Sequence, residues 1–274
     1  MSSSGSYDIQ SQHRDANSEI QRLAAQARLG WEKEARTLTW FGLKDGMSLL
    51  ELGSGPGFIT ESLLALLPDS RITCLEIDPG LVKQAEKYLQ DKAVNSVHFI
   101  EGSVMNTHLP DNRFDFAYAR LLFQHLADPI GAAKEIWRVL KPGGRLVVYD
   151  IDDEIFGLTQ PLIPEFPGIL ETFGKAQSAR GGNLYIGRSL WRIFKAAGFT
   201  NLDLEIVAPH SDNLGIEPFL PQMDPDRLLP LVKIGLVSEQ ELEKLRISRD
   251  KFLASPEPYV LMLIWMVCGE KPRG

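Results

Sequence analysis

From residue 47 onward, short apolar runs alternate with segments whose apolar residues recur every three or four positions. The short runs predict buried strands, because a strand covered on both faces is apolar throughout. The second kind predicts amphipathic helices. Strands are expected at 47–52, 71–78, 96–102, 114–120, 145–152 and 201–209, and helices at 58–68, 80–92, 129–140 and 189–199. Such alternation predicts an α/β fold with a doubly wound, largely parallel sheet.

Three segments lie outside this regular alternation. Residues 1–46 predict a flexible arm followed by a helical extension, with one apolar stripe from Ser18 to Trp40. Clustered prolines and glycines mark 153–187 and 210–258 as two late insertions, where a lid or substrate pocket would lie. The chain is therefore expected to divide into an extension, 1–46, and a domain, 47–274, which ends in an apolar strand at 259–269.

Composition narrows the class of protein. The chain has 274 residues, of which 44% are hydrophobic and 24% charged, and this composition is ordinary for a globular protein. Its formal charge of -7 disfavours a nucleic-acid partner. Cys74 and Cys268 lie in apolar runs without metal-ligand spacing, so we expect reduced core residues and no metal. The sequence shows no signal peptide and no apolar run of membrane-spanning length, which predicts a cytoplasmic protein.

The segment "SLLELGSGPGF" (48–58) follows a predicted strand and precedes a predicted helix, as nucleotide-binding turns do. Its glycines would let the backbone approach a ligand, although a tight structural turn is an alternative. Phe58 stands where a dinucleotide fingerprint has its third glycine, which disfavours nicotinamide and flavin cofactors. Glu51 is placed for a cationic amine and Glu76, twenty-three positions after Gly53, for a ribose diol. A ligand with a ribose and an amine but no pyrophosphate fits both carboxylates.

Five motifs give the chain a family resemblance: "LLELGSGPG" (49–57), "CLEIDPGLVKQAE" (74–86), "FIEGSVMNTHLPDNRFDFAYA" (99–119), "FQHLADP" (123–129) and "RVLKPGGRLVVYD" (138–150). In order and spacing they resemble the class I S-adenosylmethionine-dependent methyltransferases of the small-molecule type related to the ubiquinone and menaquinone methyltransferases. The resemblance covers roughly residues 47–152. It implies a Rossmann-like, seven-stranded sheet whose last strand, near 259–268, is antiparallel, and S-adenosylmethionine as cofactor, with S-adenosylhomocysteine as product.

The resemblance also implies which residues bind the cofactor. Glu51 would lie beneath the glycine loop, Glu76 would accept hydrogen bonds from the ribose, and Ile77 would pack on adenine. Ser103 stands where the family usually has aspartate, so the adenine amino group would be met by a backbone carbonyl or water. The full cofactor set is Glu51, Gly53, Ser54, Gly55, Gly57, Glu76, Ile77, Gly102, Ser103, Val104, Arg120 and Gln124.

Methyl transfer from a sulfonium needs orientation and exclusion of water, and it needs a base only when the acceptor must lose a proton. His125 and Asp150 are the candidate catalytic residues, and either could instead be structural. Asp152 and Asp153 share the end of the fifth strand with Asp150, so any of the three could face substrate. Candidate substrate-binding residues are Tyr7, Asp152, Arg180, Asn183 and His210.

We therefore expect an enzyme that methylates a small organic acceptor, either a secondary metabolite or a quinone-like molecule. Phe156, Phe166, Phe173, Tyr185 and Phe219 in or beside the insertions favour an apolar or aromatic acceptor, unless they form the insertions' own core. One alternative is a non-catalytic, cofactor-binding partner or regulatory subunit, and another is a nicotinamide-dependent oxidoreductase. The N-terminal extension could also exchange between subunits of a homo-oligomer.

Overall fold

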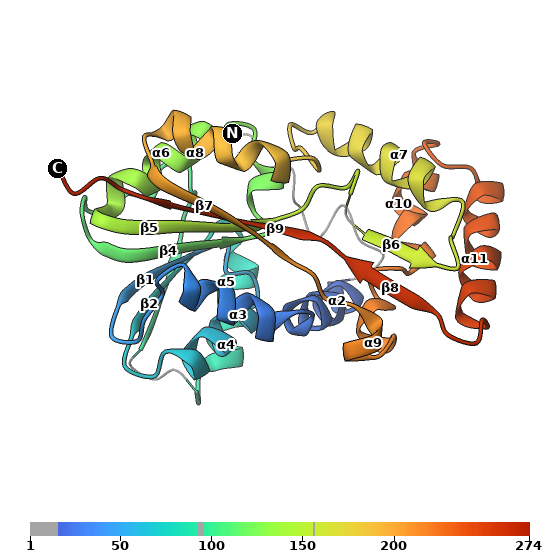
Figure 1. The fold of residues 1–274 in the computed structure, drawn as a ribbon, viewed down its shortest axis with the longest axis horizontal. Coiled ribbons are helices and arrows are strands. Elements are labelled where there is room, and N and C mark those ends of the chain that lie inside the picture. The colour runs from blue at the N-terminus through green and yellow to red at the C-terminus, as the bar shows by residue number, and fades with distance from the viewer. Residues whose placement is uncertain (1–15, 93–95, 156) are drawn as a thin grey trace.

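The computed structural model describes residues 16–92, 96–155 and 157–274, and its centre is a seven-stranded sheet (Figure 1). The first five strands in the chain are parallel, and β9 runs antiparallel to both of its neighbours. This arrangement confirms the predicted doubly wound sheet with an antiparallel last strand. The strand order across the sheet is β3 (Val97–Glu101), β2 (Arg71–Glu76), β1 (Ser48–Leu52), β4 (Phe114–Arg120), β5 (Leu140–Asp150), β9 (Ile264–Glu270) and β7 (Thr200–Val207).

The two faces of the sheet build two apolar cores, because successive side chains of a strand point to opposite sides. Leu49 and Phe116 pack into the core on the side of α3 (Trp31–Trp40) and α4 (Phe58–Leu66). Their neighbours Leu50 and Ala117 pack into the other core, beneath α6 (Pro129–Val139) and α8 (Leu190–Ala197). Figure 1 shows these two helix layers on opposite sides of the sheet, and α5 (Pro79–Leu89) contacts β2 and β3.

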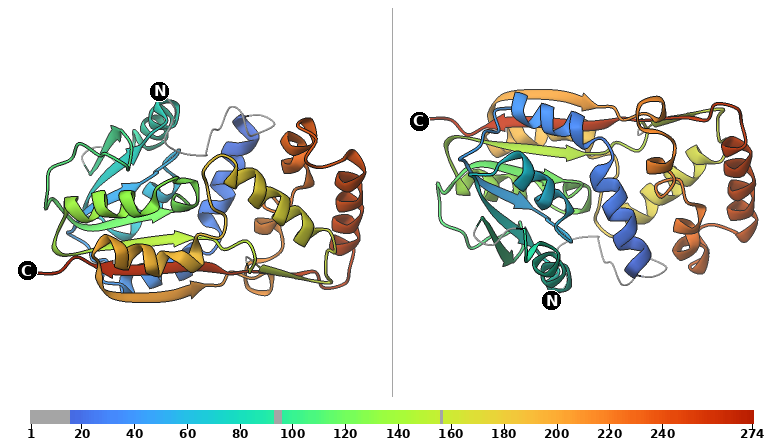
Figure 2. Two further views of the ribbon diagram at one scale, coloured as in Figure 1. Left: turned by 90° about the horizontal axis from the view of Figure 1, so that it is seen from above. Right: turned by 90° about the horizontal axis from the view of Figure 1, so that it is seen from below.

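A second layer of structure, the cap (157–178 and 211–262), lies beyond the carboxyl ends of the parallel strands (Figure 1). Its own apolar residues, including Phe219, continue the core on the α3 side of the sheet. Helix α2 (Ala16–Arg28) lies between the sheet and the cap helices in both views of Figure 2. The cap consists of β6 (Gly157–Gln160), α7 (Phe166–Ser178), α9 (Ser211–Leu214), η3 (Glu217–Phe219), η4 (Pro225–Leu228), α10 (Leu229–Lys233), α11 (Glu239–Leu253) and β8 (Tyr259–Met262).

The structure differs from the sequence-based expectations in three places. The segment with the N-terminal apolar stripe forms two helices, because Gly30 has a left-handed φ of 79° that ends the first helix. A Cβ at Gly30 would lie 3.4 Å from Pro209. The final apolar run is two strands, since β8 pairs with β6 in the cap while β9 pairs with β5 and β7 in the main sheet. The first insertion contains a strand, β6, and a helix, α7, for which the sequence analysis made no prediction.

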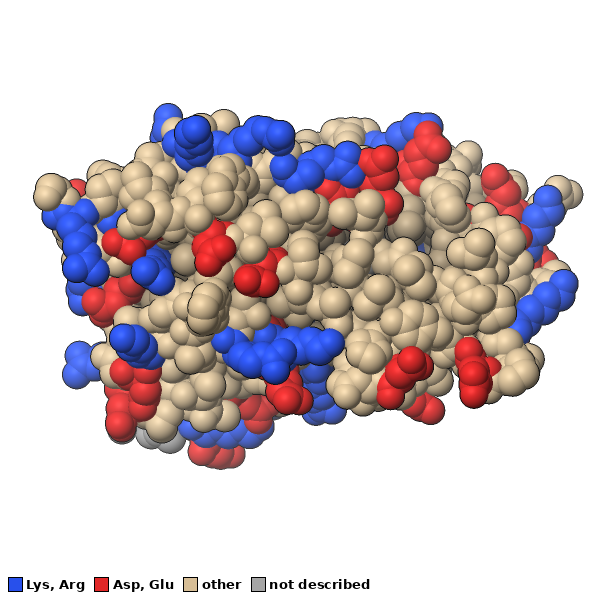
Figure 3. All heavy atoms as spheres, viewed as in Figure 1, with Lys and Arg blue, Asp and Glu red and all other residues tan. Residues whose placement is uncertain are grey.

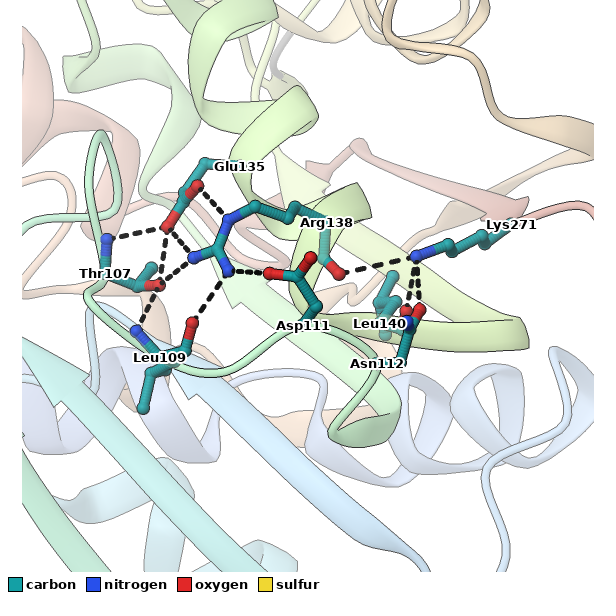
Figure 4. Close-up of polar contacts among 8 residues, drawn as sticks. All are labelled: Thr107, Leu109, Asp111, Asn112, Glu135, Arg138, Leu140 and Lys271. Atoms are coloured by element: carbon teal, nitrogen blue, oxygen red, sulfur yellow. Dashed lines mark hydrogen bonds and ion pairs between the residues drawn. The ribbon is translucent and has the colours of Figure 1, made fainter.

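A polar network fastens the connection before β4 to α6 at the amino end of the sheet, away from the glycine loop (Figure 4). The backbone N–H and hydroxyl of Thr107 donate to Glu135 at 2.8 and 2.6 Å, and Arg138 pairs with both Glu135 and Asp111. Partial burial would raise the pKa of Glu135, but hydrogen bonds from Arg138 and Thr107 lower it to about 2. We assign this network to stability.

Lys271, which follows β9, extends that anchor to the end of the chain (Figure 4). Its ammonium donates to the carbonyl of Leu140 at 2.7 Å and to the side chain of Asn112 at 2.8 Å, and it lies 4.1 Å from the centre of the Trp137 ring. Cys74 and Cys268 are buried and unbridged, as the sequence predicts. Among the described residues, no helix combines the length and apolar character that crossing a membrane requires.

Candidate functional site

The glycine loop follows β1 and bends in a way that favours glycine, with φ values of +66° at Gly53, +54° at Gly55 and +86° at Gly57. Gly57 packs against α5, because a Cβ there would lie 3.2 Å from Ala85. Gly55 differs, since a Cβ would meet no protein atom within 4 Å. The backbone at Gly55 therefore faces open space, which a ligand can approach closely.

Glu76, at the carboxyl end of β2, is tied to this loop by its carboxylate. Oε2 accepts the N–H of Gly55 at 2.9 Å, while Oε1 accepts the N–H groups of Ile77 and Asp78 at 2.8 and 3.0 Å. Burial raises the pKa of Glu76, and these three N–H groups counteract the rise. A carboxylate has about four lone-pair sites, so Glu76 retains capacity for a further donor such as a ribose hydroxyl.

Glu51 is oriented into the protein beneath the loop. Its Oε2 accepts hydrogen bonds from the hydroxyl of Thr60 at 2.7 Å and from the thiol of Cys74 at 3.5 Å. Burial raises its pKa to about 7, with Thr60 and Cys74 opposing the rise. In the structure Glu51 thus holds the loop against α4, and its carboxylate makes its contacts with the protein itself.

The residues around the loop fit a ribose-bearing cofactor. Gly55 leaves room at the backbone, Ser54 Oγ is buried without a hydrogen bond of ordinary geometry, and Glu76 has acceptor capacity left. Ile77 is 49% exposed, which is unusual for an isoleucine and suits a side chain that covers an aromatic base. These residues are close to one another in the fold: they lie at the ends of the adjacent strands β1 and β2 and in the loop after β1.

The segment after β3 contains Gly102, Ser103 and Val104, which the sequence analysis predicted to lie near the adenine base. Gly102 donates its N–H to the carbonyl of Glu76 at 2.8 Å, which places it beside the ribose-binding position. Ser103 uses its hydroxyl to accept the N–H of Met105 at 3.2 Å. Val104 is buried in the core under α6, so a contact with the base would come from its backbone and not from its side chain.

Arg120, at the end of β4, lies in a buried ion pair with Glu34 of α3. Its Nε donates to both carboxylate oxygens, at 3.1 and 3.0 Å, and Tyr118 donates to the same carboxylate. Another guanidinium nitrogen donates to the carbonyl of Gln26 at 2.9 Å. Desolvation alone would lower the pKa of Arg120, but Glu34 raises it above its usual value. Arg120 therefore fastens the N-terminal helices onto the sheet.

Sequence reasoning missed Glu34, although the sequence carries a signal for it. Trp31, Glu34 and Leu38 share one face of α3, so a carboxylate occupies a position in an otherwise apolar stripe. Such a residue needs a buried partner, because burying an unpaired charge is very costly.

Gln124 and Asp150 meet above the carboxyl ends of β4 and β5. The backbone N–H of Gln124 donates to Asp150 Oδ2 at 3.1 Å, and Ile151 donates to the other oxygen at 2.9 Å. Burial raises the pKa of Asp150 to about 7, with these N–H groups opposing the rise. The Gln124 side chain donates to the carbonyl of Leu121 at 3.2 Å, so both groups take part in shaping the loop after β4.

His125 contacts Gln177 of α7, with 2.8 Å between its Nδ1 and the amide nitrogen. Desolvation lowers the pKa of His125 to about 4, and the positive charges of Arg180 and Arg22 add to the effect. The imidazole is therefore neutral at physiological pH, and its low basicity disfavours a role as general base. Its contact with α7 connects the sheet to the cap.

Asp152 and Asp153 follow β5 but differ in their surroundings. The carboxylate of Asp152 is fully buried and pairs with Arg188 through both oxygens. The distance from Arg188 Nη2 to Asp152 Oδ1 is 2.6 Å. Asp153 is 8% exposed, and no hydrogen bond to its carboxylate contributes to its ionisation. Burial raises its pKa to about 7, opposed by the charge of Arg227 and increased by that of Asp152.

A polar cluster, which we call the cap cluster, joins α2 to the cap at this position. Arg22 pairs with Glu19 at 2.6 Å and donates to Gln222 Oε1 at 3.1 Å, while Arg227 donates to the backbone carbonyl of Gln222 at 2.8 Å. Desolvation lowers the pKa of Arg227 to about 10, and Arg22 adds to the effect. The cap cluster comprises Glu19, Arg22, Asp153, Gln222 and Arg227.

Two groups of the cap cluster have no hydrogen-bond partner among the described residues: the carboxylate of Asp153 and the amide nitrogen of Gln222. Arg227 is solvent-exposed even though the surrounding protein desolvates it enough to lower its pKa. Sequence reasoning missed Arg22, Gln222 and Arg227, which lie in segments far apart in the chain and carry no motif.

The other predicted substrate residues are spread around the cap. Arg180 donates to Gln177 at 3.2 Å and is largely exposed. Asn183 accepts the N–H of Tyr185 at 2.9 Å and so shapes its own loop. His210 precedes α9 with Nδ1 buried and unbonded. Tyr7 and Phe156 lie outside the described residues, and Phe166, Phe173 and Phe219 pack in the cap's own core.

Charge on the surface is mixed, with acidic and basic side chains interspersed over the face in Figure 3. Basic side chains gather where α3 crosses this face (Figure 3). A groove of about 310 Å³ between α3 and β7 is lined there by Lys33, Arg36, Trp40 and Ile206, among others. This groove is separate from the carboxyl ends of the parallel strands, where the glycine loop and the cap cluster lie.

Comparison with known sequences gives a family match within the sheet domain. A family profile described as "Methyltransferase domain" matches residues 50–148. Sterol 24-C-methyltransferase erg6 of Aspergillus fumigatus is 34% identical over 110 residues, which are 40% of this chain and 29% of that protein. Demethylmenaquinone methyltransferase of a Geobacillus species is 25% identical over 198 residues, or 67% of this chain and 82% of that protein. The chain thus spans less than a third of the sterol enzyme.

Comparison with solved structures agrees on the fold. Phosphoethanolamine N-methyltransferase 2 of Haemonchus contortus, solved with phosphomonomethylethanolamine and S-adenosylhomocysteine, matches with a TM-score of 0.56 and 19% identity. The match covers 89% of this chain and 53% of that protein. At this identity the likeness concerns the fold alone.

Proposed function

The chain belongs to the class I S-adenosylmethionine-dependent methyltransferases, and on that premise we propose that it methylates a small organic acceptor held beneath the cap. The observation that carries this proposal is the glycine loop, whose Gly55 backbone faces open space while its N–H is held by Glu76. The same loop fits a cofactor with a ribose and an amino-acid part. A quinone-like or other apolar secondary metabolite is our proposed acceptor class, supported by the similarity to a sterol 24-C-methyltransferase and a demethylmenaquinone methyltransferase.

The proposal gives each part of the site a distinct role. Gly53, Ser54, Gly55 and Glu76 would hold the cofactor, and Ile77 would cover its base. When bound, S-adenosylmethionine would supply an electrophilic methyl group, with the electron pair of the S–CH3 bond remaining on sulfur. The chain's own residues would orient the acceptor and exclude water, which are the main demands of such a displacement.

The position of α2 supports an enclosed acceptor site. This helix lies between the sheet and the cap (Figure 2), and the Arg120–Glu34 ion pair fastens the N-terminal helices to β4. Acceptor and cofactor would therefore meet above adjacent strands β1, β4 and β5, at the carboxyl edge where open α/β sheets bind ligands.

A deuterated methyl donor tests the proposal. The purified protein is incubated with S-adenosylmethionine carrying a CD3 group and with menadiol, a hydroquinone, as acceptor, and the products are analysed by mass spectrometry. We expect a CD3-labelled acceptor with the wild type and none with Gly55→Val, because a side chain there would fill the cofactor's space.

Gly46→Val is the matched control for that variant. Gly46 also has a positive φ, +82°, and open space around its Cβ position, so the backbone strain of the substitution is similar. It lies before β1, at the opposite end of that strand from the loop. Equal loss of product in both variants would refute the assignment of the glycine loop to cofactor binding.

A further inference from the structure

We propose that Asp153 and Gln222 recognise a hydroxyl group on the acceptor, and that Asp153 accepts the proton which this hydroxyl loses on methylation. This inference rests on the proposed methyltransfer and narrows its substrate class to alcohols and phenols. It assigns a catalytic role to a carboxylate outside the known motifs and a specificity role to a residue of the cap.

Asp153 is singled out by comparison with its two neighbours. Asp150 accepts backbone N–H groups on both oxygens, and Asp152 is held by Arg188. Both carboxylates are thereby satisfied within the protein. Asp153 is almost as deeply buried, but it is stabilised only by the more distant charge of Arg227 among the described residues. A buried acceptor of this kind is costly unless a ligand supplies a donor.

Gln222 supplies the complementary group. Its Oε1 must face Arg22, because a guanidinium can only donate hydrogen bonds. Its amide nitrogen is then fixed on the other side, and it is buried without a hydrogen-bond partner. An unsatisfied buried donor is costly, and an oxygen atom of a bound ligand would recover that cost.

Arg227 connects the two groups. It donates to the backbone of Gln222, and its charge acts on Asp153. We place the acceptor hydroxyl between the buried carboxylate of Asp153 and the amide nitrogen of Gln222, which both lack a hydrogen-bond partner among the described residues. A hydroxyl at this position would be offered one free acceptor and one free donor.

The two unpartnered groups of the cap cluster favour a neutral ligand group. The carboxylate of Asp153 would repel a carboxylate or phosphate, and an ammonium, which can only donate, would leave the amide nitrogen of Gln222 unsatisfied. A hydroxyl carries no charge, donates one hydrogen bond and accepts others, so it matches both Asp153 and the amide nitrogen of Gln222.

The proton balance of the reaction follows from this placement. As the acceptor oxygen forms its bond to the methyl carbon, the O–H bond breaks and its proton passes to a carboxylate oxygen of Asp153. Burial raises the pKa of Asp153 to about 7, which suits a base at neutral pH. The charged groups that act on it are Arg227 of η4 and the adjacent Asp152, itself paired with Arg188.

Calorimetry with a matched pair of probes tests the inference. 2-Naphthol and 2-methylnaphthalene have the same ring system, but only 2-naphthol carries a hydroxyl. Each is titrated into the protein saturated with S-adenosylhomocysteine. We expect the wild type to bind 2-naphthol at least about tenfold more tightly, as one satisfied buried donor–acceptor pair implies.

Three variants identify the groups responsible. Asp153→Asn and Gln222→Leu should reduce the preference for 2-naphthol to less than about threefold, because each removes one half of the recognition. Glu154→Gln is the control, since Glu154 is the next carboxylate along the chain but is exposed and pairs with Arg188. It should keep the full preference.

The outcomes separate this inference from the proposed function. A wild type that fails to bind S-adenosylhomocysteine refutes the function itself. A wild type that binds it but shows equal, or no, binding of the two naphthalenes refutes hydroxyl recognition alone, as does a preference that survives in Asp153→Asn. If Asp153→Asn loses S-adenosylhomocysteine binding through misfolding, Gln222→Leu decides: a retained preference overturns the inference and a lost one supports it.

Discussion

Replacing Glu34 by leucine would leave the guanidinium of Arg120 buried without its carboxylate. The side chains of Arg120 and Glu34 are 10% and 0% exposed, so water can compensate little of the loss. Removing one partner of a buried ion pair costs about 3–5 kcal/mol. Tyr118 would also lose the acceptor of its hydroxyl, for about 1–3 kcal/mol more. We expect Glu34→Leu to lower the free energy of unfolding by about 4–6 kcal/mol, allowing for incomplete additivity.

The assay is urea unfolding followed by tryptophan fluorescence, with the midpoint and slope analysed together. The double variant Glu34→Leu/Arg120→Met removes both charges and should recover most of the loss, because no charge is then stranded. Adding Tyr118→Phe should bring the protein to within about 1 kcal/mol of the wild type. Glu32→Leu, at an exposed position of the same helix, should change stability by less than about 0.5 kcal/mol.

The reasoning would be refuted by a small effect or by simple additivity. If Glu34→Leu cost less than about 1 kcal/mol, the pair would not be desolvated as the structure shows. If the double variant were as unstable as the sum of the single variants, the two charges would not depend on each other.

Two further predictions concern the network at the other end of the sheet. Glu135→Gln should cost about 2 kcal/mol at pH 7, because charge-assisted hydrogen bonds to Arg138 and Thr107 are lost. The pKa of Glu135 is lowered to about 2, so the stability that its carboxylate contributes is complete above about pH 4.5 and disappears toward pH 2. Urea unfolding between these pH values should show the stabilities of the wild type and the variant converging as the pH falls. A constant difference would contradict this assignment. Lys271→Met should lower the free energy of unfolding by about 1–3 kcal/mol, because the carbonyl of Leu140 loses its donor. Lys195→Met, on the exposed face of α8, is the control and should leave stability unchanged in the same urea assay. Equal effects of the two substitutions would argue against the anchor.

The sequence predicted those parts of the molecule that depend on local pattern. Strands such as 114–120 and the glycine loop are specified by neighbouring residues, so their positions follow from periodicity and turn chemistry. Glu76 could be singled out because a carboxylate at a strand end has a recognisable distance from the loop, and the structure shows it bonded to the Gly55 N–H. Its contact with a ribose stays a prediction. The buried Glu34 was accessible in principle, as a carboxylate in an apolar helical stripe.

Other features depend on contacts that pattern does not encode. The apolar run 259–269 contains no turn residue at Leu263, and its division into β8 and β9 reflects which strands are available for pairing. The sequence around Arg120 does not distinguish a contact with a ligand from the ion pair that Arg120 forms with Glu34 of α3. The cap cluster joins α2, the end of β5 and the second insertion, so its residues become neighbours only after the cap has packed.

Binding of S-adenosylhomocysteine and of NADH, measured separately by calorimetry on the wild-type protein, tests the central claim most directly. Our account predicts micromolar affinity for S-adenosylhomocysteine and no detectable heat with NADH. Binding of NADH alone would contradict the account and, with it, the assignment of the glycine loop, Glu76 and the acceptor site beneath the cap.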